Sequence, residues 1–188
     1  IEAAARTPGI AALDPFIGQR VDLLGQEGLL AAGDFEVAAR YGRLLFRRGE
    51  STTILRRARA EDGVIISESL ALSRGLTEGD RLPLYLPSGR IEPPIVGVFY
   101  DYSTDGGKVV MDRGLWARTG GGHGSDILAI YLQPGADEAA VRRQLLAIAG
   151  EDGAIALNSN RALKARVLEI FDNTFAVARA LELIAILV

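Results

Sequence analysis

The segment 176–188 carries only two charged residues, Arg179 and Glu182, and its last six residues are all apolar. A soluble helix normally ends at a cap and does not leave a large apolar surface uncovered, and this segment shows no such cap or cover. It is too short to span a bilayer, which takes about 20 apolar residues. We therefore interpret 176–188 as the start of a truncated transmembrane helix. A buried C-terminal core helix is the alternative interpretation.

The length and composition bound the remaining possibilities. The chain has 188 residues, of which 48% are hydrophobic and 24% charged, as in a globular protein of one large domain or two small ones. A net charge of −3 argues against nucleic-acid binding. Because the chain has no cysteine, disulfides, thiolate metal sites and thiol catalysis are excluded. A single histidine disfavours a histidine-based metal site.

The first third of the chain alternates between turn signals and extended segments. Thr7-Pro8-Gly9 ends a short helix, and Gly25-Gln26-Glu27-Gly28 has the composition of a turn. We predict, in order, a helix at 1–6, extended segments at 10–24 and 29–37, and a polar connection at 49–62.

The middle of the chain has sharper signals. Val64-Ile65-Ile66 predicts a short strand, Ser67 is a good N-cap for a helix, and Gly75 is placed to end that helix. Strands are predicted at 81–86, 91–100 and 108–111. Pro93 and Pro94 place the start of the second of these strands at a sheet edge. Three short strands at this spacing predict a small barrel or a curled sheet.

The C-terminal third predicts a strand–helix–strand unit. The apolar run 127–132 is typical of a strand that is buried on both faces, and a helix at 137–149 and a strand at 154–157 follow it. Asn158 or Ser159 caps a last helix, whose apolar stripe comprises Leu163, Val167, Ile170, Phe171 and Phe175. From Ala176 the polar face of this helix nearly disappears, which predicts a stalk that enters a membrane.

Three stretches in a fixed order carry a family resemblance. They are Val-Ile-Ile-Ser-Glu-Ser-Leu-Ala at 64–71, Gly-Leu-Thr-Glu-Gly-Asp-Arg-Leu at 75–82 and Ile-Val-Gly-Val-Phe-Tyr-Asp-Tyr at 95–102. Together with Pro8-Gly9-Ile10 and Phe-Asp-Asn-Thr-Phe-Ala at 171–176, they resemble the periplasmic domain of FtsX-like ABC transporter permeases, also called the MacB-like periplasmic core domain. The motif residues to which the resemblance assigns a structural role are Ser67, Glu68, Gly79, Asp80, Gly97, Asp101 and Tyr102.

The resemblance implies an α+β fold built from two subdomains. Residues 1–45 and 125–175 would form a membrane-proximal α/β subdomain that contains the strand–helix–strand (βαβ) unit and the long C-terminal stalk helix. Residues 46–124 would form an inserted, mainly β subdomain, and 176–188 would begin the transmembrane helix.

The resemblance also implies a role in transport without catalysis and without a cofactor. The domain would lie on the periplasmic side of the bacterial inner membrane and would transmit ATPase-driven motion to an exported lipoprotein, lipid or peptide, or to a partner. Its partners would be a cytoplasmic ABC ATPase subunit, a second copy or relative of the permease, and the membrane. A free-standing ligand- or protein-binding module with a buried C-terminal helix is the alternative.

One loop resembles a calcium-binding loop of the EF-hand type. Asp101, Ser103 and Asp105 offer oxygen ligands at positions one, three and five, and Asp112 offers a carboxylate at position twelve. However, Lys108 occupies a position that is normally apolar, and the preceding segment predicts a strand rather than a helix. A glycine-rich hairpin loop is the favoured interpretation of these residues.

Other candidate sites have simple structural interpretations. His123 lies among four glycines, and the chain has no Gly-x-Ser-x-Gly nucleophile elbow, which favours a loop histidine over a catalytic one. No Gly-Lys-Ser/Thr follows these glycines, which argues against a phosphate-binding loop. Trp116 is predicted to pack under the glycine loop, and the adjacent carboxylates Glu61 and Asp62 to lie on the surface.

Overall fold

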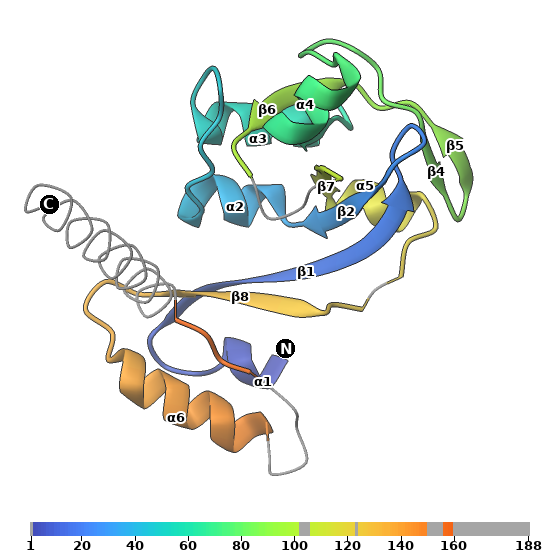
Figure 1. The fold of residues 1–188 in the computed structure, drawn as a ribbon. Helices are drawn as coiled ribbons and strands as arrows, with labels where there is room; N and C mark the ends of the chain where they lie inside the picture. The colour runs from blue at the N-terminus through green and yellow to red at the C-terminus, as the bar shows by residue number, and fades with distance from the viewer. Residues whose placement is uncertain (1, 102–105, 123, 150–155, 160–188) are drawn as a thin grey trace, which may run out of the picture. The chain divides into compact units, whose positions relative to one another are not determined.

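The computed structural model describes residues 2–101, 106–122, 124–149 and 156–159 (Figure 1). The chain divides into two compact units, Ile1–Asp137 and Glu138–Val188. All strands that the structure describes belong to the first unit.

Helices and strands alternate irregularly along the first unit. Its helices are α1 (Glu2–Ala5), α2 (Phe35–Tyr41), α3 (Ser51–Ala60), α4 (Glu68–Arg74) and α5 (Arg113–Arg118). Its strands are β1 (Ile10–Asp22), β2 (Glu27–Gly33), β3 (Val64–Ser67), β4 (Leu84–Leu86), β5 (Gly89–Ile91), β6 (Ile95–Phe99), β7 (Lys108–Asp112) and β8 (Ile127–Leu132). The second unit contains α6 (Glu138–Ala149).

Six strands form one mixed sheet in the order β6-β3-β7-β2-β1-β8, and β4 and β5 form a separate antiparallel pair (Figure 1). In the six-stranded sheet β3 is parallel to β6, and β7 is parallel to β2, whereas the other neighbours are antiparallel. The mixed sheet with its helices confirms the predicted α+β class. The subdomain boundaries at 45/46 and 124/125 stay a prediction.

The sheet is covered on both faces because successive side chains of a strand point to opposite sides. On one face Val64, Ile66 and Met111 pack against α4, α5 and the β4–β5 pair. On the other face Ile65 and Val110 pack against apolar residues of α2 and α3. The strands β3, β6 and β7 are therefore the most buried strands of the first unit.

The long strand β1 changes partners halfway along its length. Its first half, from Ile10 to Phe16, pairs with β8, and its second half, from Ile17 to Asp22, pairs with β2. Pro15 lies at the change, where its missing N–H group cannot extend the ladder toward β2. A single strand thus connects the β8 side of the sheet to the β2 side.

Two predictions for the segment between β2 and β3 are wrong. The extended segment predicted at 29–37 ends at Gly33, because the Asp34 side chain accepts hydrogen bonds from the N–H groups of Glu36 and Val37 and so starts α2. The polar connection predicted at 49–62 contains α3. Ile54, Leu55 and Ala58 share one buried face of this helix.

The predictions for 64–75 are confirmed in detail. Ser67 caps α4 by accepting a hydrogen bond from the Leu70 N–H group at 3.3 Å. Gly75 ends the helix in the left-handed conformation, with φ of 64°. The predicted sheet-edge position of 93–94 is also confirmed, since β6 is an end strand of the six-stranded sheet.

The predicted small barrel or curled sheet is wrong. The strands β6 and β7 do not pair with each other, because β3, which precedes them in the sequence, lies between them. The spacing of the three strands indicated local pairing, and the tertiary structure instead inserts β3 by a parallel crossover to β6.

The prediction that 127–132 is buried on both faces is also wrong. Ile127 is 66% exposed and the rest of β8 is half-buried, because no described residue of β8 belongs to either of the two apolar clusters that cover the sheet. The predicted helix at 137–149 is confirmed as α6. Of the strand predicted at 154–157, Ala156 and Leu157 are not in a strand, and 154–155 fall outside the described residues.

The predicted stalk helix and the start of a transmembrane helix fall on 160–188, outside the described residues. Within the part of the chain that the structure describes, no helix is both long enough and apolar enough to cross a membrane.

Candidate functional site

The family-motif residues Ser67 and Glu68 connect the start of α4 to two neighbouring segments. The Ser67 hydroxyl also accepts a hydrogen bond from the N–H group of Lys108, the first residue of β7, at 2.9 Å. Glu68 forms an ion pair with Arg47 at 3.7 Å. Ser67 therefore serves two elements with one side chain, as a helix cap and as a partner of the first residue of β7.

The other motif residues shape the outer edge of β6. The Asp80 carboxylate accepts hydrogen bonds from the backbone and the hydroxyl of Thr77, and Gly79 adopts a φ of 95° that favours glycine. At Gly97 a side chain would meet Phe46 and Ile54 at 3.0 Å or less, which explains the need for glycine. These positions keep backbone segments close together, and Tyr102 falls outside the described residues.

The described part of the proposed calcium loop has other partners. Asp101 forms an ion pair with Lys108 at 2.5 Å, and Asp112 lies at the opposite end of β7. An extended strand rises about 3.3 Å per residue, which separates Asp112 from the start of the strand by about 13 Å. Ser103 and Asp105 fall outside the described residues, so the calcium site stays a prediction.

The favoured interpretation of this loop, a glycine-rich hairpin, is wrong about the hairpin, because β6 and β7 on either side of it do not pair and β3 lies between them. The glycines themselves have a structural role. Gly107 accepts a hydrogen bond from the Leu29 N–H group at 3.0 Å, and a side chain at Gly28 would collide with the carbonyl oxygens of Gly106 and Gly107. Glycine is required here because two backbones approach each other closely.

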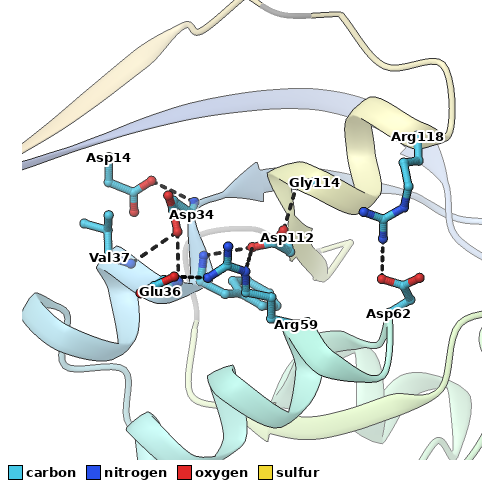
Figure 2. Close-up of polar contacts among 10 residues, drawn as sticks. Asp14, Asp34, Glu36, Val37, Arg59, Asp62, Asp112, Gly114 and Arg118 are labelled. Carbon is cyan, nitrogen blue, oxygen red and sulfur yellow. Dashed lines mark hydrogen bonds and ion pairs between the residues drawn. The ribbon is translucent and has the colours of Figure 1, made fainter.

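Three aspartates, Asp14, Asp34 and Asp112, lie where β1, the end of β2 and the end of β7 come together; we call them the aspartate junction (Figure 2). Asp14 accepts a hydrogen bond from the Asp34 N–H group at 2.8 Å. Asp112 accepts from the N–H groups of Phe35 at 3.1 Å and Gly114 at 2.8 Å. Each carboxylate thus binds a backbone N–H group at the start of α2 or of α5.

Asp14 is the unusual member of the junction. Its side chain is fully buried, and its Oδ2 atom has no hydrogen-bond partner in the described structure. Burial raises its pKa from 3.8 to about 6. The hydrogen bond from Asp34 opposes this rise, the negative charges of Asp34 and Asp112 add to it, and the positive charge of Arg113 opposes it.

Arg59 connects α3 to the same junction (Figure 2). It forms ion pairs with Glu36 in the first turn of α2 and, at 4.0 Å, with Asp112. Beside it, Arg118 of α5 pairs with Asp62, which confirms the predicted surface position of that carboxylate. The junction is therefore a polar contact that joins β1 and β7 to α2, α3 and α5, with charge of both signs.

Asp14 and its neighbours were not among the residues that the sequence singled out. A signal was present, since Asp14 is the only charged residue in the run Ile-Ala-Ala-Leu-Asp-Pro-Phe-Ile at 10–17. A lone carboxylate in a half-buried strand must find partners or lose its charge. Which partners it finds depends on β2 and α2, which the local sequence does not specify.

The remaining candidates are a groove, a tryptophan and a histidine. A groove of about 340 Å³ is lined by Arg47, Arg48, Thr77, Glu78 and Val98. Trp116 is buried and donates a hydrogen bond to the Gly122 carbonyl at 3.0 Å, which confirms that it packs against the glycine loop. His123 falls outside the described residues. Among the residues that are described, no group of three or more His, Asp or Glu side chains could hold a metal ion.

Comparisons with known proteins show a relation in sequence. No family model matches the chain. It is 30% identical over 142 residues to an uncharacterized ABC transporter permease protein of Mycobacterium tuberculosis. The match covers 74% of this chain and 16% of the relative, so the chain spans about a sixth of the relative's length.

Solved structures show the same fold. The chain is similar to the periplasmic region of MacB from Actinobacillus actinomycetemcomitans, with a TM-score of 0.52 and 11% identity over 78% of this chain and 69% of that one. It is also similar to the extracellular domain of the noncanonic ABC-type transporter YknZ from Gram-positive bacteria. That match has a TM-score of 0.50 and 10% identity over 76% of this chain and 74% of that one.

Proposed function

We propose that this chain is the extracytoplasmic domain of an ABC transporter permease. The premise is that it has the fold of MacB-like periplasmic domains and is related in sequence to such a permease. The observation that carries the proposal is the 30% identity over 142 residues, which includes the region of the three resembling stretches. The permease would lie in the bacterial inner membrane with this domain on the periplasmic side.

The domain would transmit motion between the membrane and an exported substrate or a partner. The support comes from the connections of β1, whose two halves pair with β8 and β2. The turn before β1 is also joined to the end of β8, because the Gln133 N–H group donates to the Gly9 carbonyl at 2.8 Å. Through these backbone hydrogen bonds a displacement of α1 or of β8 would be passed to β1, and from β1 to β2.

The domain itself would be non-catalytic. ATP hydrolysis would take place in a separate cytoplasmic ATPase subunit, and a second permease copy or relative would complete the transporter. The cargo would be a lipoprotein, a lipid or a peptide. This role needs stiff elements and surfaces that can bind rather than a catalytic centre.

The location can be tested by cysteine labelling, because the chain contains no cysteine of its own. A Tyr85→Cys variant of the full-length protein, otherwise cysteine-free, places a thiol at a residue that is 73% exposed. We expect a membrane-impermeant maleimide to label it in intact spheroplasts. The buried variant Leu55→Cys is the matched control and should label only after denaturation. Labelling of Tyr85→Cys only after lysis would contradict the proposal.

The transmission of motion needs a second measurement. A spin label at residue 85 in both permease copies reports the distance between the two domains in the reconstituted transporter. We expect the distance distribution to change when ATP is added, and to remain unchanged with an ATPase subunit that cannot hydrolyse ATP. An identical distribution in the two cases would rule out a motion driven by hydrolysis. Recovery of the protein as a soluble, membrane-free species would favour the free-standing binding module.

A further inference from the structure

The Asp14 side chain replaces a missing part of the β1–β2 ladder. Backbone pairing between these strands ends at Ile17 and Ala32. Two residues before Ile17 on β1 is Pro15, which has no N–H group to donate. Beyond this point the Asp34 N–H group donates to Asp14 Oδ1, and the Pro15 carbonyl accepts from Arg113 at 2.9 Å. The contact between β1 and the start of α2 therefore rests on side chains.

This contact has one unmet hydrogen-bonding atom. Oδ1 of Asp14 is satisfied, whereas Oδ2 is buried and has no partner in the described structure. A buried oxygen of an ionised carboxylate without a partner costs much more free energy than the same oxygen bearing a proton. The arrangement therefore fits the neutral acid better than the carboxylate.

Charged and titratable groups face Asp14 from each element that packs around it. Asp34 precedes α2, Asp112 ends β7, and Arg113 begins α5. On β8, Tyr131 lies near enough for the Asp14 charge to add to the effect of burial in raising the Tyr131 pKa. Tyr131 in turn stacks on Tyr41 of α2, with ring centroids 5.5 Å apart. The two acidic neighbours oppose ionisation of Asp14, whereas Arg113 favours it.

We propose that Asp14 makes this junction a proton-controlled contact: when protonated it holds β1 closed against the start of α2, and when ionised it opens the contact to water. Hydration is the route by which a buried charge with an unpartnered oxygen regains its lost interactions. The burial that favours the protonated form raises the Asp14 pKa to about 6, which places the transition slightly below neutral pH. The inference concerns the fold alone and does not depend on the transport role.

The experiment is an NMR titration of the 188-residue chain between pH 4 and pH 8. We expect the Asp14 carboxyl carbon to titrate with a midpoint of about 6. The amide resonances of Asp34 and Phe35 should move with the same midpoint. Their hydrogen exchange, corrected for the intrinsic effect of pH, should become about tenfold faster between pH 5 and pH 7.5, because the ionised form favours the open state.

The control variants separate this effect from the titration of other groups. In Asp14→Asn the amide shifts and the change in exchange should disappear, whereas Asp22→Asn, at an exposed position of the same strand, should behave like the wild type. If Asp14→Asn does not fold, the wild-type titration decides alone. An Asp14 midpoint below pH 5, or exchange at Asp34 and Phe35 that does not change with the ionisation of Asp14, overturns the proposal.

Discussion

The strands β3 and β8 have similar sequences but different surroundings. Val64-Ile65-Ile66 of β3 is completely buried, whereas Ile127 at the start of β8 is 66% exposed and the rest of β8 is half-buried. β3 lies between β6 and β7 and is covered on both faces, whereas no described residue of β8 belongs to either apolar cluster. Apolar composition therefore identifies a strand, and the elements packed on its faces determine how deeply it is buried. The end strand β6, whose residues belong to both apolar clusters, is buried along its whole length.

The same contrast applies to polar groups. Ser67 at the end of β3 finds two N–H partners, one from α4 and one from β7. Asp14 on β1, the neighbour of β8, is just as deeply buried but keeps one oxygen without a partner. Ser67 near the centre of the sheet thus has its hydrogen bonds satisfied, whereas the aspartate junction contains one carboxyl group whose protonation depends on pH.

The largest expected effect tests the contrast between the two strands directly. Ile65→Ala should lower the free energy of unfolding by about 3–4 kcal/mol, because the side chain is completely buried between β3 and the helices α2 and α3, and its loss leaves a cavity. Ile127→Ala is the matched control and should change it by less than about 0.5 kcal/mol. Urea unfolding followed by the fluorescence of Trp116, the single tryptophan, measures both values. Equal losses would mean that β8 is covered as well as β3.

The next effect concerns Asp14 and depends on pH. Below pH 3.8 the carboxyl group is protonated in the folded and the unfolded chain, so it does not affect stability. Between 3.8 and about 6 the unfolded chain has released the proton and the folded chain has not, so stability falls as the pH rises. Above about pH 6 the loss in the free energy of unfolding is constant, on the order of 2–3 kcal/mol.

Asp14→Asn should remove this loss. We expect the unfolding free energy of the variant relative to the wild type to rise by on the order of 2–3 kcal/mol between pH 4 and pH 7.5. The difference between the two pH values cancels any constant cost of the new amide group. A difference that is the same at both pH values would show that Asp14 titrates normally. Urea unfolding at a series of pH values provides the measurement.

A smaller effect is expected at the polar end of β3. Ser67→Ala removes the cap of α4 and the partner of the Lys108 N–H group, and should lower the free energy of unfolding by about 1–2 kcal/mol. Ser73→Ala, at an exposed position of the same helix, should cost less than about 0.5 kcal/mol. Similar losses in the two variants would show that the hydrogen bonds of Ser67 stabilise the chain no more than an exposed serine of the same helix does.

The smallest effect is expected for the ion pair between Glu36 and Arg59, whose side chains are 71% and 47% exposed. Glu36→Gln should change the unfolding free energy by about 0.5 kcal/mol or less, because exposed pairs are weakened by solvent and by salt. Thermal unfolding at low and high salt measures the effect, and the difference should shrink at high salt. A loss above about 1 kcal/mol would mean that the pair supports the buried Asp112.

Local signals explain most of what was predicted correctly. The cap at Ser67, the helix end at Gly75 and the packing of Trp116 against glycines each depend on residues within a few positions of one another. The predictions at 49–62 and 34–37 failed for the converse reason. Thr52 and Thr53 weaken the helix signal of α3, whose stability comes from packing Ile54 and Leu55 against the sheet and α2.

The aspartate junction could not be predicted because its members come from three separate parts of the chain. Asp34 and Asp112 are both helix caps, which local sequence can indicate, but their approach to Asp14 depends on how β2 and β7 are placed beside β1. The pKa of Asp14 follows from burial by these elements, and burial is a property of the folded chain.

The sequence by itself determined the fold class, the family resemblance, most of the strands and the caps of α4, because turn residues, caps and apolar periodicity act over short distances. The tertiary structure decided the order of the strands, the exposed edge at β8 and the burial of Asp14. These features depend on long-range pairing, in which β3 is inserted between β6 and β7 and β1 changes partners at Pro15. The free energy of a buried carboxyl group is set by such neighbours, and neighbours distant in sequence are known only once the chain has folded.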